Sequence, residues 1–244
     1  MATFSISIAG DSAVNLEFAR TITPETSRLV RVAAQTLTDD PVRGIVEVMP
    51  TFCSLMVCYD PLVIGYDDLV AGISGKLRNL SVVETGMRRI VSIPVCYGGS
   101  FGPDLDTVAA HARLTPDEVV DLHSGRDYLI DMLGFLPGFA YLGGLDPRLH
   151  TPRLATPRTV IPAGSIGIGG AQTGIYPLPS PGGWQLIGRT PLRPYDPDRA
   201  QPILYSAGDY LRFTPIGEDR YHALEAQIAA GQYVYDIRME ERWG

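Results

Sequence analysis

The sequence predicts two domains: a small α+β domain of the ferredoxin type, followed by a mainly-β domain built as a barrel. The first ninety residues alternate short apolar runs with helical patterns, which is typical of a sheet covered by helices. Residues 134–195 hold 12 glycines and 10 prolines, a density that prevents long helices and favours short strands joined by tight turns. We therefore expect an α+β domain over residues 1–90 and a β-barrel domain over residues 91–244.

The first elements are predicted by turn and cap signals. Residues 3–8 and 13–18 alternate polar and apolar side chains on either side of Gly10-Asp11, which predicts a β-hairpin. Thr23-Pro24-Glu25 combines a capping hydroxyl, a proline tolerated in the first turn and an acid that favours a helix N-terminus. A helix should begin there, with an apolar stripe formed by Leu29, Ala33 and Leu37.

The rest of the first domain follows the same alternation. Residues 44–49 and 54–59 are apolar or β-branched runs around Pro50-Thr51 and predict two strands. A helix carrying Leu69, Ile73 and Leu77 on one face should follow, and residues 89–95 should close the domain with a strand. The order strand–helix–strand–strand–helix–strand, after one extra strand, is the basis for the ferredoxin-like prediction.

Three helices are expected in the second domain. One covers residues 104–112, and another begins at Thr115-Pro116-Asp117, where the capping pattern of the first helix recurs. The third covers residues 219–230, has Tyr221, Leu224 and Ile228 on one face, and ends at Gly231.

Composition and charge argue against several classes of protein. The N-terminus lacks the basic region of a signal peptide, and no apolar run approaches the ~20 residues of a membrane-spanning helix. A formal net charge of −7 argues against a nucleic-acid partner. The three cysteines are too scattered for a disulfide framework or a thiolate metal site, and the four histidines lack metal-ligand spacing. We expect a cytoplasmic protein without a metal site, a membrane anchor or a nucleic-acid partner.

A basic segment within this acidic protein predicts an anion site. Residues 134–195 contain five arginines and one acid, Asp146, a local net charge of +4. Guanidinium groups bind carboxylate and phosphate oxygens in pairs. The alternative is that these arginines lie on the surface and form ordinary ion pairs. The arginines are Arg148, Arg153, Arg158, Arg189 and Arg193.

The same segment is rich in aromatic and neutral polar residues, which together describe a small-molecule pocket. The aromatic residues alone are equally compatible with a barrel core. The predicted substrate- or anion-binding residues are Phe135, Tyr141, Arg153, Arg158, Gln172, Thr173, Tyr176, Trp184, Gln185 and Arg189. No catalytic residue is identified; His150 is a weak candidate for a general base, and a solvated turn histidine is the competing interpretation.

Long motifs in the segment resemble a known family. They are GFLPGFAYLGGLD at 134–146, GAQTGIYP at 170–177 and SPGGWQLIGRT at 180–190, supported by GDSA at 10–13 and IPVCYGG at 93–99. This pattern resembles the B-type subunit of 5-oxoprolinase, also called allophanate hydrolase subunit 1, a family that includes the KipI-type inhibitor of a histidine kinase. The resemblance covers essentially the whole chain.

The resemblance implies a cyclophilin-like barrel and a subunit of an ATP-dependent hydrolase that opens small cyclic amides such as 5-oxoproline. It implies a related C-type subunit of 5-oxoprolinase as an obligate partner and a third subunit that completes ring opening. We expect ATP as cofactor, with its magnesium held mainly by the partner. The methionine–lysine–methionine of a biotin carrier is absent from the sequence, so no covalent biotin is expected.

Residue chemistry suggests how such a site could act. Phosphorylation of an amide oxygen turns a poor electrophile into one that water attacks, a step that needs charge neutralisation. In this interpretation Arg153, Arg158 and Arg189 hold phosphate or carboxylate. Two alternatives stay open: a KipI-like inhibitor that docks on a histidine kinase, and a carboxyltransferase component like that of urea carboxylase.

Overall fold

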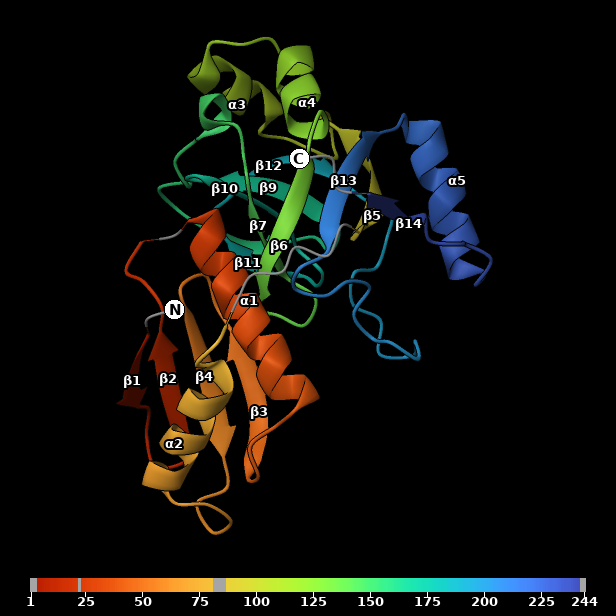
Figure 1. Cartoon of the computed structure of the whole chain (residues 1–244). Helices are drawn as coiled ribbons and strands as arrows, with labels where there is room; N and C mark the ends of the chain where they lie inside the picture. The colour runs from red at the N-terminus through yellow and green to blue at the C-terminus, as the bar shows by residue number, and fades with distance from the viewer. Residues whose placement is uncertain (1–3, 22, 81–86, 242–244) are drawn as a thin grey trace. The chain divides into compact units, whose positions relative to one another are not determined.

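A computed structural model describes residues 4–21, 23–80 and 87–241 of the chain. Its contacts divide the chain into two compact units, residues 1–85 and residues 86–244, whose course can be followed in Figure 1. Each unit has its own apolar core. Within the described residues, no helix combines the length and apolar character needed to cross a membrane.

The first unit is a four-stranded antiparallel sheet with strand order β1-β2-β4-β3 and two helices on one face. Leu16, Leu55 and Val57 point from the sheet into the core that the helices cover. The expected hairpin is confirmed, because Ser5 pairs with Glu17 across the turn. The elements are β1 (Ser5–Ile8), β2 (Ala13–Glu17), α1 (Pro24–Asp39), β3 (Ile45–Pro50), β4 (Ser54–Tyr59) and α2 (Tyr66–Leu77).

Helix α1 begins where its cap signal predicts. The Thr23 hydroxyl oxygen accepts the Thr26 amide at 3.1 Å, which satisfies one of the free N–H groups of the first turn. The buried stripe consists of Val30, Ala33, Ala34 and Leu37. Leu29, expected within this stripe, is only half-buried.

The prediction that residues 89–95 close the first unit is wrong. Strand β5 (Met87–Tyr97) belongs to the second unit, where it pairs with three other strands. Its residues Ile90, Val91, Ile93 and Val95 are fully buried, as expected of a strand whose two faces are both covered. Among the described residues, the first unit therefore lacks the last strand of a ferredoxin-like arrangement.

The second unit contains a closed barrel. Seven strands of its described residues follow the order β12-β9-β10-β7-β6-β13-β5, and β5 pairs again with β12 to close the sheet. The expected mainly-β barrel is thus confirmed. Its strands, in addition to β5, are β6 (Asp127–Leu133), β7 (Ala140–Gly143), β9 (Ser165–Gly169), β10 (Gln172–Ile175), β12 (Gln185–Arg189) and β13 (Tyr210–Pro215).

The remaining elements of the second unit surround the barrel. The C-terminal strand β14 (Ile237–Glu241) pairs with the first half of β5, and β8 (Arg158–Ile161) pairs with β11 (Ser180–Gly182) in a separate ribbon. The three predicted helices are present within two residues of their expected limits. They and a 3-10 turn are α3 (Leu105–Ala112), α4 (Pro116–Ser124), α5 (Glu218–Ala229) and η1 (Pro147–Leu149).

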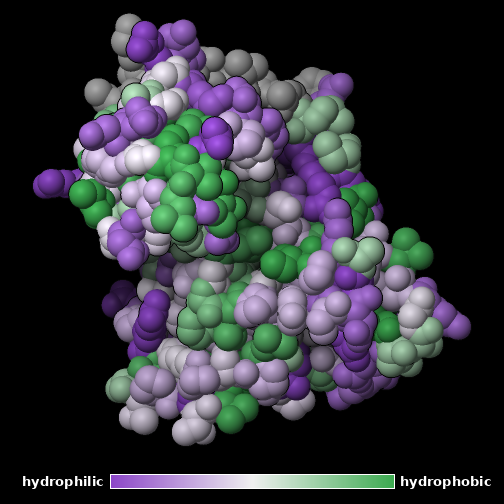
Figure 2. Space-filling view, turned by 90° about the horizontal axis from the view of Figure 1, so that it is seen from below, coloured by the Kyte–Doolittle hydropathy of each residue, from purple (hydrophilic) through white to green (hydrophobic). Residues whose placement is uncertain are grey.

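Large apolar side chains remain exposed in both units. Leu62 in the first unit is 95% exposed and Val234 in the second is 86% exposed. Figure 2 shows a face of the molecule on which apolar patches are interspersed with hydrophilic side chains. Single exposed apolar side chains are common on protein surfaces, whereas apolar side chains grouped around a cavity indicate a binding site.

Candidate ligand-binding pocket

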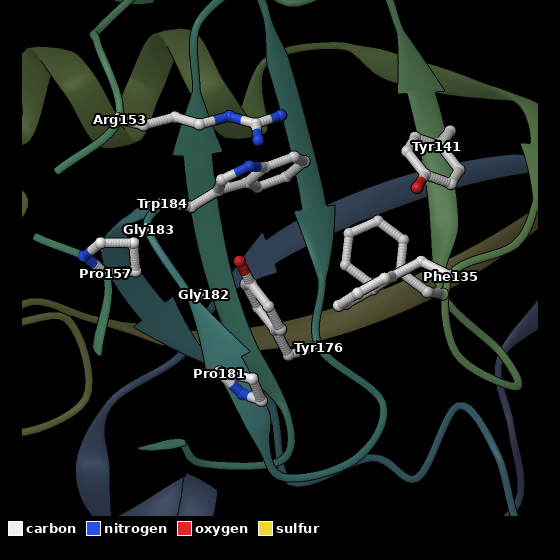
Figure 3. A pocket seen from close by; sticks show the side chains of 10 residues that line it. Phe135, Tyr141, Arg153, Pro157, Tyr176, Pro181, Gly182, Gly183 and Trp184 are labelled. Atoms are coloured by element: carbon white, nitrogen blue, oxygen red, sulfur yellow. The ribbon is translucent and has the colours of Figure 1, made fainter. Parts of the chain in front are cut away.

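A pocket of about 380 Å³ lies beside the ribbon of β8 and β11. Its walls come from the β6–β7 connection, from the loop before β8, and from β11 with the residues after it (Figure 3). This volume suits a small molecule. The lining residues are Phe135, Phe139, Tyr141, Arg153, Pro157, Tyr176, Pro181, Gly182, Gly183 and Trp184.

The walls are aromatic rings that hold one another in place. The Phe139 ring centroid lies 5.1 Å from Tyr141, 5.5 Å from Tyr176 and 5.7 Å from Trp184. Phe139, Tyr176 and Trp184 are buried, and their mutual angles are close to edge-on. Aromatic rings prefer such edge-to-face contacts, which hold the rings at fixed angles, so these walls are formed before a ligand binds.

Glycines allow the rings to pack so closely. A Cβ atom at Gly169 would lie 2.4 Å from the Trp184 indole, and one at Gly182 would lie 2.6 Å from the Tyr176 hydroxyl. Any larger residue would displace a wall of the pocket. The glycine-rich composition of the segment therefore has a packing reason at these two positions.

Arg153 is the one charged residue among the described residues that line the pocket. Its guanidinium lies over the Trp184 ring, 5.8 Å from the ring centroid, as Figure 3 shows. Within the part of the chain that the structure describes, Arg153 forms no ion pair. A cation placed on an indole and lacking an acidic partner can bind an incoming anion without first breaking a salt bridge.

Two tyrosines add hydroxyl groups to the apolar walls. Burial raises the pKa of Tyr176 above its ordinary value, against a smaller opposing effect of the Arg153 and Arg158 charges. Tyr176 is therefore neutral at physiological pH and can donate a hydrogen bond. Tyr141, half-buried on β7, lines the pocket as well.

The structure brings together five of the ten predicted binding residues: Phe135, Tyr141, Arg153, Tyr176 and Trp184. The other five do not line this pocket. The three arginines expected to share an anion do not converge, because Arg158 and Arg189 are engaged elsewhere.

Arg158 has a structural role. Its Nη2 donates to Asp104 Oδ1 at 2.7 Å, and its Nη1 donates to the Trp184 carbonyl oxygen at 3.4 Å. Asp104 is buried and its other oxygen accepts the Leu186 amide at 2.6 Å. Arg158 thus links the β8 ribbon to the loop before α3 through an ion pair with a partner 54 residues away.

Arg189 lies in another cluster. Its guanidinium is 6.0 Å from the Phe101 ring centroid, and its Nε atom is buried without a hydrogen-bond partner among the described residues. Phe101 packs with Tyr221 of α5, with 4.7 Å between their ring centroids. This cluster does not share a residue with the pocket lining.

Thr173 belongs to a buried polar chain inside the barrel. Its hydroxyl donates to the Gly167 carbonyl at 3.1 Å and accepts from His123 Nε2 at 2.8 Å. His123 Nδ1 then accepts the Tyr97 hydroxyl at 2.8 Å, since its only ring proton is on Nε2. Burial, and to a smaller extent the Arg126 charge, lower the pKa of His123 to about 3.

The two glutamines and His150 also lie outside the lining. Gln185 is buried and donates to the Pro152 carbonyl oxygen at 3.0 Å, which positions the residue before Arg153. Gln172 is half-buried at the start of β10. His150 is half-buried at the end of the turn η1 and does not line the pocket.

Sequence reasoning missed the two prolines of the lining, Pro157 and Pro181. They carry no chemical signal, and only the fold places their rings at the pocket. It also missed Asp104 and His123, whose partners are distant in sequence. No group of three or more His, Cys, Asp or Glu side chains in the described residues could hold a metal ion.

Comparisons with known proteins agree with the motifs. A family model described as carboxyltransferase domain, subdomain C and D, matches residues 4–205. A curated protein of Bacillus subtilis (strain 168), named as the B-type subunit of 5-oxoprolinase, is 44% identical over 235 residues, which are 92% of this chain and 98% of that protein.

Two solved structures add a measure of the fold. The crystallised protein TTHA0988 is 36% identical with a TM-score of 0.75, and the match covers 84% of this chain and 40% of that chain. The Kluyveromyces lactis urea carboxylase is 20% identical with a TM-score of 0.79, covering 97% of this chain and 24% of that chain. The second likeness shows the fold alone. Most of the present chain thus matches a part of each of two longer chains.

Proposed function

This chain belongs to the family of B-type subunits of 5-oxoprolinase, within the carboxyltransferase domains, and from that premise we propose that it forms the amide-binding part of an ATP-dependent 5-oxoprolinase. The observation that carries the proposal is Arg153, a cation without an acidic partner among the described residues, lying over Trp184 in an aromatic pocket. A small flat ring with one carboxylate has the complementary chemistry.

The substrate 5-oxoproline is a five-membered lactam with a carboxylate. In the proposed complex Arg153 binds the carboxylate through two parallel hydrogen bonds, the geometry that a guanidinium favours. Phe139 and Trp184 pack against the ring and exclude water from it. The neutral Tyr176 hydroxyl can donate a hydrogen bond to the lactam group, and Tyr141 forms a further part of the wall. The chain's residues thereby bind and orient the amide before any chemistry occurs.

The pocket does not fit a nucleotide. A triphosphate carries several negative charges, whereas the described lining offers one cation. Magnesium prefers carboxylate and water ligands, and the described residues hold no suitable cluster. We therefore assign ATP and its magnesium mainly to a partner of the C-type subunit class, and we derive no step through ATP on this chain.

The name of the family denotes a subunit, which supports a complex of several chains. The proposed partners are the C-type subunit of 5-oxoprolinase and a third, ring-opening subunit. The match of this unit to 40% of the longer TTHA0988 chain is compatible with such an association. We place the complex in the cytoplasm, a location supported by the small number and wide spacing of the cysteines, Cys53, Cys58 and Cys96.

Variants at Arg153 test the proposal in the reconstituted three-subunit complex. Arg153→Ala should weaken transition-state binding by about 1.5–3 kcal/mol, the range for charged hydrogen bonds, seen as a lower kcat/KM for 5-oxoproline. Arg153→Lys should also lose activity, because it keeps the charge and loses the planar fork. Arg20→Ala, a change at a side chain that is 94% exposed, is the matched control. Full activity of both Arg153 variants would refute the assignment.

A carboxyltransferase role is the second candidate, and the description of the matching family model favours it. The same pocket would then hold a small urea-like amide as the acceptor of a carboxyl group. Assays of the complex with 5-oxoproline, with urea, and with urea plus a biotinylated carrier protein separate the two. Turnover that requires the carrier would favour the carboxyltransferase.

A further inference from the structure

The β6–β7 connection contains an unusual turn centred on Phe135. The Leu136 amide donates to the Gly134 carbonyl oxygen at 2.7 Å, and the φ angle of Phe135 is +64°. A hydrogen bond between residues i and i+2 around a residue with positive φ defines the classic γ-turn, which is rare and strained. Phe135 is one of two described non-glycine residues with positive φ.

A phenylalanine is a poor choice for this backbone conformation. The Cβ atom of an L-residue crowds the backbone at positive φ, and glycine or asparagine tolerate the region far better. The same connection uses glycine at position 138, where φ is +79°. The requirements of the turn alone would therefore favour glycine or asparagine at position 135.

Burial of the ring does not compensate for this strain. The Phe135 residue is 62% exposed, whereas neighbouring Phe139 is buried. The Phe135 ring meets Phe139 edge to face, with 5.5 Å between centroids and an interplanar angle of 87°. It lines the pocket, as Figure 3 shows, and also a second hollow of about 340 Å³ that is lined by residues 133–138 and Ile203.

Strained backbone at the edge of a pocket is found where a side chain must be held in a particular place. We propose that Phe135 is a specificity-determining residue whose γ-turn holds its ring at the pocket, where it packs against one face of a small flat ring ligand that carries a carboxylate. This inference rests on the proposed function for the identity of that ligand. The ring is exposed in the free chain and becomes covered when the ligand binds.

The test separates folding from binding by means of Phe135→Asn, which tolerates positive φ and removes the ring. The urea midpoint of the chain should equal or exceed that of the wild type, because the strain is relieved. The dissociation constant of 5-oxoproline, measured by calorimetry on the reconstituted complex, should rise about tenfold, because the variant loses an aromatic contact and the area that it buries. Phe135→Leu should give an intermediate value. Leu62→Asn, at a side chain that is 95% exposed outside this unit, should change neither quantity.

The outcomes distinguish this inference from the proposed function. Wild-type affinity in Phe135→Asn, or a lower urea midpoint, would overturn the role of Phe135. If Arg153→Ala weakens the binding of 5-oxoproline while Phe135→Asn binds it like the wild type, only the present inference fails. If Phe135→Asn weakens the binding of 5-oxoproline while Arg153→Ala binds it like the wild type, the inference stands and the carboxylate assignment fails. A wild-type complex that does not bind 5-oxoproline would overturn both.

Discussion

Arg153 and Arg158, five positions apart in the sequence, differ in the partners that the fold gives them. Arg153 lies over Trp184 at the pocket, whereas Arg158 forms an ion pair with the buried Asp104. The first can bind a ligand, and the second stabilises the protein. Their residue type and local sequence do not separate these roles.

The Arg158→Ala variant should therefore lower the free energy of unfolding. Removing the guanidinium leaves a buried carboxylate with one partner fewer, at a cost of about 1–3 kcal/mol. Urea denaturation measures this loss, and Arg153→Ala is the matched control that should stay within about 0.5 kcal/mol of the wild type. Equal stability of the two variants would contradict the assigned roles.

His123 predicts a pH dependence of stability. Its pKa in the folded protein is about 3, against 6.5 in the unfolded chain, so between these values the unfolded state binds the extra proton. The free energy of unfolding should decrease as pH falls below about 6.5, by about 1.4 kcal/mol per pH unit from this residue. Tyr97 and Tyr128, whose pKa values are raised by burial, contact His123 and stay neutral in this range, as does Thr173.

Urea denaturation at pH 7, 6 and 5 tests this prediction. The comparison is between the wild type and His123→Gln, which cannot titrate. The variant should be less stable at pH 7 but should lose less stability on acidification. Parallel pH profiles for the two proteins would show that His123 does not remain neutral in the folded state.

At the scale of secondary structure, local signals determine where helices begin. Helix α4 opens with a capping box: the Thr115 hydroxyl oxygen accepts the Glu118 amide at 3.2 Å, and the Glu118 carboxylate accepts the Thr115 amide at 2.7 Å. The hydrogen bond from the Thr115 backbone, followed by that from its hydroxyl, lowers the pKa of Glu118. The stabilisation of the folded chain by the ionised Glu118 carboxylate is therefore present above the ordinary pKa of a glutamate and is lost on acidification.

Thr115→Ala should lower the free energy of unfolding by about 1 kcal/mol, the typical value of an N-cap. Thr115→Ser keeps the capping oxygen and should retain most of the stability. Thermal or urea unfolding at pH 7 measures both. A serine variant that loses as much as the alanine variant would indicate that the threonine methyl group, rather than the cap, is responsible.

Strands depend on distant partners more than helices do. Strand β5 has the apolar pattern expected of a buried strand, yet the pattern does not say which sheet it joins. Its parallel partner β13 lies more than a hundred residues later in the chain, and its second half pairs with β12. Adjacency in sequence suggested the first unit, and long-range pairing places β5 in the second.

At the scale of the whole molecule, the proposed division of labour between subunits predicts that this chain alone is inactive. The described residues provide the pocket that we propose for a small amide, but no cluster of three or more His, Cys, Asp or Glu side chains that could hold magnesium. The purified chain should therefore show no 5-oxoproline-dependent ATP hydrolysis, and addition of the C-type partner and the third subunit should produce it. Release of phosphate measures both states. Substantial turnover by the single chain would contradict the assignment of ATP to the partner.

The sequence by itself determined the features that depend on near neighbours and on composition. Thr23 and Thr115 mark helix starts because an N-cap acts within three residues. The glycine and proline density of residues 134–195 predicts short strands and turns, and its long motifs identify the family. The same segment supplies every described residue that lines the pocket, including the predicted aromatic walls.

Tertiary structure alone decided which of these residues act together. The fold pairs Arg158 with Asp104 and Thr173 with His123, partners 54 and 50 residues apart. Arg158 and Thr173 are therefore not available to the predicted site. The fold leaves Arg153 beside Trp184 and holds Phe135 in a γ-turn, neither of which a local pattern signals. The physical reason is that ion pairs, ring contacts and strand pairing depend on distance in space, and chain closure in a barrel brings together residues that no sequence window contains.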